Sequence, residues 1–259
     1  MSGQLRNIIY EKKDRIATII LNRPEVLNAL SPEMIDELIS ALNDAKDDKD
    51  VRVVIITGVG RAFSAGGDLN AIKNYEKLEV MLKGVNEIVR LLASMEKPVI
   101  AAVNGIAVGA GLSLALACDI IIASDQARFG SAFVRVGLVP DTGATFYLPR
   151  CVGLHLAKEL AFTGRMIDAN EAQRIGLVNK VVPASELQAT VDSLAKELAD
   201  GPPIAVGLTK KLLNKSPNVS LESALDYETC AQLVCARTED FKEGVSAALE
   251  KRRPKFAGK

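Results

Sequence analysis

The alternation of apolar and polar stretches along the chain predicts a sheet whose strands are joined by helices. β-Branched apolar runs over residues 51–57, 99–103 and 120–123 carry almost no charge, as expected of strands covered on both faces. Apolar residues recur at helical spacing after Ser31, a helix-capping residue type, and again over residues 78–95. Strands that alternate with helices in this way indicate an α/β fold with a parallel-type sheet.

The end of the chain has a different pattern. Further strands are predicted at residues 8–10, 16–21, 127–129 and 177–182, and further helices at residues 112–118, 143–151, 154–162 and 171–175. After Pro183 the pattern is helical without a strand signal, over residues 186–198, 204–213, 221–236 and 240–249. We therefore divide the chain into a core over residues 1–200 and a helical region over residues 201–259.

Two of the predicted strands are followed by loops of glycine and other small residues. Residues 63–68 read FSAGGD and residues 105–111 read GIAVGAG. Because parallel neighbouring strands end at one edge of a sheet, we expect the two loops to lie together. Exposed amides at the start of a helix stabilise negative charge on a carbonyl oxygen, so the pattern predicts an oxyanion site. Close packing of helix on strand would explain the same glycines, and a membrane span over residues 98–118 is disfavoured by Asn104 and three glycines.

The amino-acid composition argues against several classes of ligand and of catalytic chemistry. The 259 residues include 32 basic and 32 acidic side chains, so no global field draws the chain to nucleic acid or to an anionic membrane. The four cysteines have no metal-binding spacing, and the single histidine, His155, excludes chemistry that needs several imidazoles. The N-terminal MSGQLRN lacks the apolar core of a signal peptide. We expect reduced thiols, a cytoplasmic location and no metal.

Several ordered motifs, together covering nearly the whole chain, carry a family resemblance. They are NRPEVLNAL, FSAGGDL, KPVIAAVNGIAVGAGL, CDIIIAS, FGSAFVRVGLVPDTGATFYLPR, GLVNKVVP and KRRPKF. With these motifs the chain resembles the crotonase superfamily of enoyl-CoA hydratases and isomerases. The resemblance implies a spiral of ββα turns with a helical C-terminal region that mediates trimerisation, trimers often pairing into hexamers. It also implies an acyl-CoA thioester as substrate and no separate cofactor.

The resemblance assigns catalytic roles to a few positions. It places the two oxyanion-hole amides on Ala65 and Ala110. Where hydratases of the family carry two glutamates, this chain has Ser113 and Phe133, so the carboxylate pair that holds and activates water is missing. Asp141, in GLVPDTGAT, is the remaining acid. In this respect the chain is most similar to the isomerases of phenylacetate degradation.

The environment of Asp141 is expected to suit a base. The resemblance gives it apolar neighbours in Phe133, Val139 and Phe146, which would raise its pKa. One carboxylate is enough for isomerisation, because it takes a proton from one carbon and returns it to another. The alternative is that Asp141 caps a helix that starts after it.

Binding of the CoA moiety is also assigned by resemblance. The backbone near Val26, Leu27 and Ala62 would lie beside the nucleotide, and Arg23, Arg61, Lys73 and Lys255 are candidates for its phosphates, although solvation explains each charge equally. Lys255 and Phe256 would come from a neighbouring subunit. Asp68 is expected to cap the turn after Gly66 and Gly67. The other expected substrate contacts are Gly66, Gly67, Asp68, Leu69, Gly109, Ser113 and Phe133.

These assignments predict an acyl-CoA isomerase that moves a double bond, or rearranges an epoxide, next to a CoA thioester. The alternatives are a 2-trans-enoyl-CoA hydratase of fatty-acid or aromatic degradation and a non-catalytic acyl-CoA-binding protein. A dehalogenase is disfavoured because the family's tryptophan and histidine are replaced by Phe133 and Asn86, and a serine hydrolase because no GxSxG motif occurs. The apolar positions of residues 221–236 need a covering surface, either the chain's own core or another subunit, and the resemblance favours a homotrimer or hexamer.

Overall fold

The computed structural model describes residues 5–259, and a six-stranded sheet forms its centre. The strand order is β1-β2-β3-β5-β7-β10, and every pair is parallel except the hairpin of β1 with β2. The strands are β1 (Ile8–Lys13), β2 (Ile16–Leu21), β3 (Val53–Gly58), β5 (Val99–Val103), β7 (Ile120–Ser124) and β10 (Lys180–Val182). The predicted parallel-type sheet is therefore confirmed.

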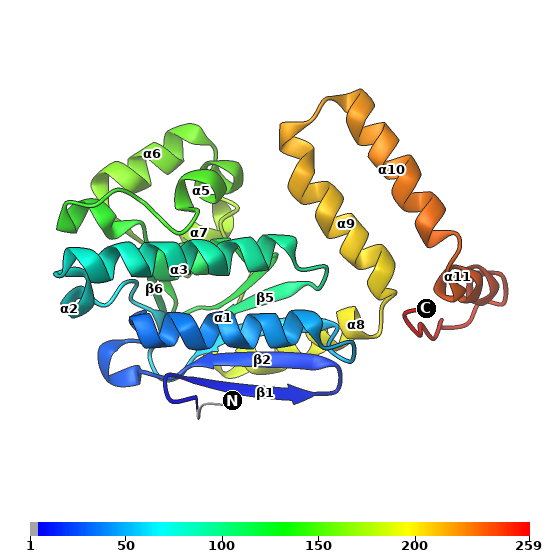
Figure 1. Ribbon diagram of the computed structural model, residues 1–259, viewed down its shortest axis with the longest axis horizontal. Helices are drawn as coiled ribbons and strands as arrows, with labels where there is room; N and C mark the ends of the chain where they lie inside the picture. Colours follow the sequence, from blue (N-terminus) through cyan, green and yellow to red (C-terminus); the bar gives the residue numbers. More distant parts are fainter. Residues whose placement is uncertain (1–4) are drawn as a thin grey trace.

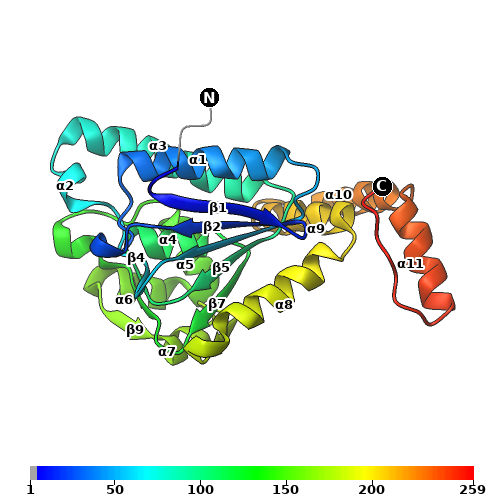
Figure 2. The ribbon, with the colours of Figure 1, turned by 90° about the horizontal axis from the view of Figure 1, so that it is seen from below.

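Helices cover both faces of this sheet, which explains why its strands carry so little charge. In β3, Val54 and Ile56 pack into the core beneath α1 (Pro32–Asp47) and α3 (Tyr75–Ser94), while Val53 and Ile55 pack against α8 (Leu187–Ala199). Figure 2 shows α1 and α3 on one side of the strands and α8 on the other. Alternate side chains of one strand are thus buried on opposite faces.

A second, smaller sheet is present, and of its strands only the one near residues 127–129 was predicted. Its strands, in the order β4-β6-β8-β9, are β4 (Ala62–Ser64), β6 (Ile106–Val108), β8 (Arg128–Gly130) and β9 (Met166–Asp168). The prediction of wholly irregular glycine loops is therefore wrong for β4 and β6. Strands of three residues are too short to show a period in the sequence. The chain runs from a strand of the large sheet to one of the small sheet and on to a helix, which is the expected spiral of ββα turns.

Four further predicted helices of the core begin and end within two residues of the predicted positions: α4 (Ala110–Leu116), α5 (Ala144–Val152), α6 (Leu154–Thr163) and α7 (Ala169–Arg174). The short helix α2 (Leu69–Ile72) and the 3-10 segments η1 (Pro24–Val26), η2 (Ala132–Val136) and η3 (Ala184–Glu186) were not predicted. α3 begins three residues before its predicted start because the side chain of Asn74 accepts a hydrogen bond from the amide of Lys77. α4 begins two residues early, at Ala110.

The C-terminal region is helical, as predicted, and extends away from the core (Figure 1). It contains α9 (Pro203–Lys215), η4 (Ser216–Asn218), α10 (Leu221–Cys235) and α11 (Glu239–Leu249). No residue of α10 is buried, so the chain's own core does not cover this helix. Within residues 5–259, no helix combines the length and apolar character needed to cross a membrane.

Candidate active site

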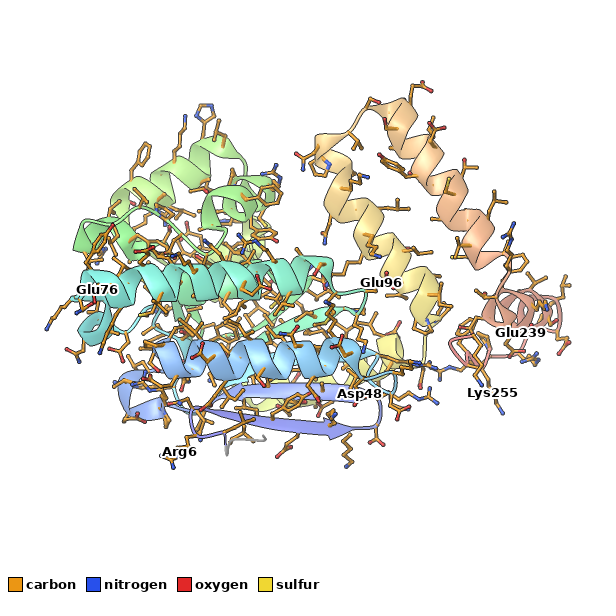
Figure 3. The ribbon with its side chains drawn as sticks, in the orientation of Figure 1. Arg6, Asp48, Glu76, Glu96, Glu239 and Lys255 are labelled. Carbon is orange, nitrogen blue, oxygen red and sulfur yellow. The ribbon has the colours of Figure 1, made fainter. Side chains whose placement is uncertain are left out.

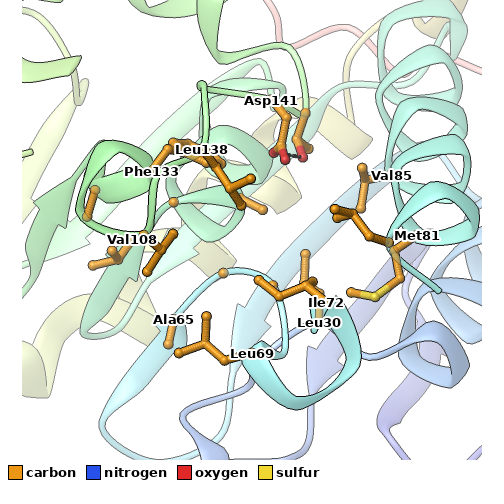
Figure 4. Close-up of a pocket in the computed structure, with 18 of the residues that line it drawn as sticks. Leu30, Ala65, Leu69, Ile72, Met81, Val85, Val108, Phe133, Leu138 and Asp141 are labelled. Atoms are coloured by element: carbon orange, nitrogen blue, oxygen red, sulfur yellow. Dashed lines mark hydrogen bonds between the residues drawn. The ribbon is translucent and has the colours of Figure 1, made fainter. Parts of the chain in front are cut away.

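A cavity of about 240 Å³ lies where the two glycine-rich loops meet α3 (Figure 4). Apart from one aspartate, one arginine and one threonine its walls are apolar or backbone. The lining residues are Leu30, Ala65, Gly66, Gly67, Leu69, Ile72, Leu78, Met81, Leu82, Val85, Val108, Gly109, Ala110, Ala132, Phe133, Arg135, Val136, Leu138, Asp141 and Thr142. The fold therefore brings both predicted loops and the predicted acid to one site.

The two loops touch at Gly66. Its φ of +95° is a backbone conformation that favours glycine, and a Cβ built there would lie 2.8 Å from the Val108 carbonyl oxygen and 3.2 Å from the Ala110 nitrogen. A side chain at this position would push the loops apart. The absence of a side chain at Gly66 therefore allows the two loops to approach closely, and the Ala110 amide lies at the cavity wall.

Only some of the loop amides are available to a ligand. The amide of Ala65 donates to the Leu27 carbonyl oxygen at 2.9 Å, and that of Gly66 donates to the Ser64 hydroxyl at 3.2 Å. In the described part of the chain the amide of Gly67 has no acceptor. The amide of Ala110 has none within α4, because it belongs to the first residue of that helix. The Ala65 amide, predicted for the oxyanion site, is therefore already hydrogen-bonded, and Gly67 and Ala110 carry the amides that remain available at the cavity wall.

Asp141 lies across the cavity from Ala65 (Figure 4). Its carboxylate is half-buried and accepts a hydrogen bond from the Thr142 hydroxyl at 2.8 Å. Burial raises the pKa of Asp141, and the Thr142 hydrogen bond partly opposes that shift. The side chain does not cap α5, whose N-cap is Gly143 and has no side-chain hydrogen bond. The alternative interpretation of Asp141 as a helix cap is therefore excluded.

The apolar neighbours of Asp141 differ from the predicted ones. Phe133 is buried and lines the cavity, as expected. Val139 and Phe146 do not line it, and Val139 is 77% exposed on the outer side of its loop. The expectation that these two residues desolvate Asp141 is wrong. Met81 and Val85 of α3 face the acid instead, a contact between distant segments that sequence order does not reveal (Figure 4).

The predicted serine contact, Ser113, is not at the cavity surface. Ser113 is buried within α4, where its hydroxyl donates to the Gly109 carbonyl oxygen at 3.1 Å. Its expected contact with substrate is not supported by its position. Ser64 donates to the Asn28 carbonyl oxygen, and His155 is exposed on α6, so the structure gives no support to a serine hydrolase.

The predicted nucleotide contacts gather around η1 beside the first loop. Arg23 is not a free cation, because its guanidinium nitrogens lie 3.1 Å from an Asp68 carboxylate oxygen. Asp68 also accepts a hydrogen bond from the Asn70 amide, so its predicted capping role is confirmed. Val26 is exposed, and Leu27 has a left-handed backbone that directs its carbonyl oxygen to the Ala65 amide.

Lys255 and Phe256 do not reach the cavity of their own chain. Figure 3 shows Lys255 beside α11, at the opposite end of the molecule from Glu76, which lies at the start of α3. Both residues line a separate hollow with Arg15, Glu197 and other residues near the end of α8. Their assignment to substrate thus depends on a second subunit.

Comparisons with known proteins agree over nearly the whole length. The sequence profile of the enoyl-CoA hydratase/isomerase family matches residues 11–259. The chain is 42% identical to the short-chain-enoyl-CoA hydratase of Clostridium acetobutylicum, over 96% of this chain and 97% of that protein. It is 41% identical to the 1,2-epoxyphenylacetyl-CoA isomerase of Escherichia coli, over 97% and 98% of the two chains.

Solved structures give the same answer for the fold. The crystal structure of an enoyl-CoA hydratase from Bacillus anthracis matches with a TM-score of 0.95 and 37% identity, covering 98% of this chain and all of that one. A structure described as an enoyl-CoA hydratase from Polaromonas matches with a TM-score of 0.92 and 34% identity, over 96% and 99% of the two chains. The glycine loops, the ββα spiral and these matches together place the chain in the enoyl-CoA hydratase/isomerase family of the crotonase superfamily.

Proposed function

We propose that the protein is an acyl-CoA isomerase that moves a double bond, or rearranges an epoxide, next to a CoA thioester. The observation that carries the proposal is the identity of the acids at the cavity: within residues 5–259, Asp141 is the one carboxylate among the lining side chains. Adding water to a double bond is best served by separate acid and base groups, whereas moving a proton between two carbons needs one group that works in both directions.

The proposed mechanism uses the backbone for charge and Asp141 for protons. The thioester carbonyl oxygen accepts hydrogen bonds from the amides of Gly67 and Ala110. Asp141 removes a proton from C2 of a 3-enoyl thioester, the resulting negative charge is held on that oxygen, and the same proton is returned to C4. The double bond thereby moves into conjugation with the thioester. Preorganised amide donors of this kind contribute about 3 kcal/mol each to lowering such a barrier.

We also propose the surroundings in which this chemistry operates. The CoA nucleotide lies along η1, near Val26, Leu27 and Ala62, with Lys255 and Phe256 supplied by a neighbouring subunit of a homotrimer or hexamer. The thioester is the substrate and no separate cofactor takes part. We expect a cytoplasmic location, which is supported by the four cysteines, all of them free thiols.

The test replaces Asp141 with a neutral isostere. Asp141→Asn should lower kcat/KM at least 100-fold for a 3-enoyl-CoA, measured as the gain of conjugated thioester absorbance, while the affinity for CoA measured by calorimetry stays the same. The matched control is Asp36→Asn, at an exposed carboxylate of α1. A loss smaller than tenfold, about 1.4 kcal/mol, would show that Asp141 is not the base.

The alternative function is a 2-trans-enoyl-CoA hydratase, and what favours it is the similarity to the Clostridium hydratase. The absorbance of the conjugated thioester distinguishes the two functions. A hydratase removes the conjugated absorbance of a 2-enoyl thioester, whereas an isomerase creates it from a 3-enoyl thioester. A protein that hydrates the 2-enoyl thioester faster than it isomerises the 3-enoyl thioester contradicts our proposal.

A further inference from the structure

A second apolar pocket lies on the outer side of the loop that carries Asp141. Its volume is about 310 Å³, and its walls come from η2, from the loop after it and from α5 and α6. Val134, Val139, Leu148, Leu154, Ala161 and Phe162 supply most of its apolar surface. We call this hollow the outer pocket.

The outer pocket adjoins the catalytic cavity along residues 132–139. Phe133 and Val136 line the cavity, whereas Val134 and Val139, from the same segment, line the outer pocket. Leu138 lines both. Figure 4 shows Leu138 beside Phe133 at the wall of the cavity. Leu138 therefore lies between two apolar spaces.

Opening this wall needs little structural change. The backbone amide of Leu138 is held by the Phe133 carbonyl oxygen at 3.1 Å, while residues 138–140 belong to no helix or strand. The preceding Gly137 has no atom within 4 Å of the position of a Cβ. The movement that would connect the cavity with the outer pocket is therefore a rotamer change of Leu138 with its backbone in place.

The volumes of the cavity and the outer pocket indicate which kind of ligand a connection between them would serve. Sites for small molecules typically measure roughly 300–1,000 Å³, and the cavity alone, at about 240 Å³, lies below that range, whereas the joined spaces lie within it. The outer pocket is lined by aliphatic and aromatic side chains with one lysine, Lys158, so its chemistry suits hydrocarbon. A short acyl group fits the cavity, and a longer one needs an exit.

We propose that the outer pocket is an acyl subsite, which takes the distal hydrocarbon of long-chain acyl thioesters, and that Leu138 is its gate. The inference rests on the proposed function in one respect, that the cavity binds acyl-CoA. It adds the class of acyl group and the residue that sets its length limit.

The experiment compares a short and a long thioester on variants that fill or open the outer pocket. Affinities for butanoyl-CoA and dodecanoyl-CoA are measured by calorimetry, and turnover with the matching 3-enoyl thioesters. Ala161→Trp, which fills the outer pocket, should weaken dodecanoyl-CoA at least tenfold relative to butanoyl-CoA. Leu138→Ala, which opens the gate, should raise the long-to-short ratio of kcat/KM at least fivefold. Leu194→Ala, an equal truncation of a half-buried leucine of α8 that lines neither space, is the matched control and should change that ratio less than twofold.

Two results would overturn the proposal. One is an Ala161→Trp protein whose ratio of long to short affinities stays within twofold of the parent. The other is a variant that changes the sedimentation of the protein without changing that ratio, because the outer pocket would then be covered by a second copy of the chain. Chain-length-dependent binding without turnover of any enoyl thioester would instead support the subsite and reject the proposed function.

Discussion

Two opposite influences act on the single carboxyl group at the cavity. Burial favours the protonated form of Asp141, and the Thr142 hydroxyl, 2.8 Å away, favours the carboxylate. Thr142 has a left-handed φ of 52°, which is uncommon for a β-branched residue and is tolerated where the surroundings enforce it. The backbone at this position thus stores strain to keep a hydroxyl beside the acid.

This balance predicts the pH dependence of the reaction. In the proposed mechanism the base is the carboxylate, so kcat/KM should fall as the pH drops through the pKa of Asp141. Because that pKa is raised, the fall should be centred above the ordinary aspartate value of about 3.9. Thr142→Val removes the hydrogen bond to the carboxylate and should move the midpoint to still higher pH, while Thr142→Ser should leave it nearly unchanged. A pH profile of kcat/KM checks both, and a midpoint unmoved in Thr142→Val would contradict the assigned role of the hydroxyl.

At this scale the sequence predicted positions better than orientations. The motif around Asp141 was enough to find the acid, and the glycine spacing found both loops. The choice between the amides of Ala65 and Gly67 could not be read from spacing, because it depends on the Leu27 carbonyl oxygen, which a left-handed backbone directs to Ala65. Val139 likewise points outward because neighbouring residues of one loop face opposite sides of a thin wall.

Among the elements, the long strands and helices were predicted more completely than the short ones. The strands of five or six residues and the helices of nine or more residues were predicted from the sequence pattern, whereas α2, β4, β6 and β9, with three or four residues each, were not. The equally short β8 and β10 were predicted, but with bounds one residue too early for β8 and a start three residues too early for β10. The pattern also gave no sign of how α9 is attached. Lys210 of α9 is buried with its ammonium nitrogen 2.7 Å from an Asp119 carboxylate oxygen and 3.0 Å from the Lys97 carbonyl oxygen.

The Lys210–Asp119 ion pair fixes α9 to the start of β5. Asp119 also accepts a hydrogen bond from the Val99 amide at 2.7 Å, and burial raises its pKa although Lys210 opposes this. Lys210→Met leaves that carboxylate without its partner and should lower the free energy of unfolding by about 3 kcal/mol, measured in urea. The deficit should shrink as the pH falls, since protonation removes the unpaired charge. The double variant Lys210→Met/Asp119→Asn should be more stable than Lys210→Met alone. A double variant no more stable than the single one would show that the unpaired charge is not the cause.

At the scale of the whole molecule, the C-terminal region is the part that leaves many apolar side chains exposed. Leu221, Leu225, Leu233 and Val234 of α10 are all exposed, Leu221 by 72%. Phe241, Val245 and Leu249 of α11 are exposed as well. Apolar surface of this extent on projecting helices is typical of subunit interfaces. The sequence predicted these helices and their apolar positions. The sequence of one chain does not show which surface covers those positions.

The tail after α11 forms hydrogen bonds and an ion pair with residues of its own chain, and these contacts affect how the role of the tail can be tested. The buried carboxylate of Asp240 accepts hydrogen bonds from the amides of Ala257 and Gly258, and Arg52 donates to the Phe256 carbonyl oxygen. Arg252 pairs with Glu243. Deleting residues 251–259 would therefore remove the hydrogen-bond partners of Asp240 together with Lys255, so side-chain variants are the sharper probe.

The last prediction concerns assembly. If α10 packs against a second subunit, the protein should sediment as three or six copies of the 27.7 kDa chain at micromolar concentration, and Leu233→Glu, which puts a charge on the exposed apolar face, should shift it towards the monomer. Lys255→Ala should weaken CoA binding about three- to tenfold without changing sedimentation, because the lysine side chain is exposed and, in the proposed assembly, would meet a phosphate only across the interface. Lys251→Ala, in the same tail, is the control of equal charge. A parent protein that sediments as a monomer, or equal effects of the two lysine variants on CoA affinity, would contradict the proposal that a neighbouring subunit completes the nucleotide site.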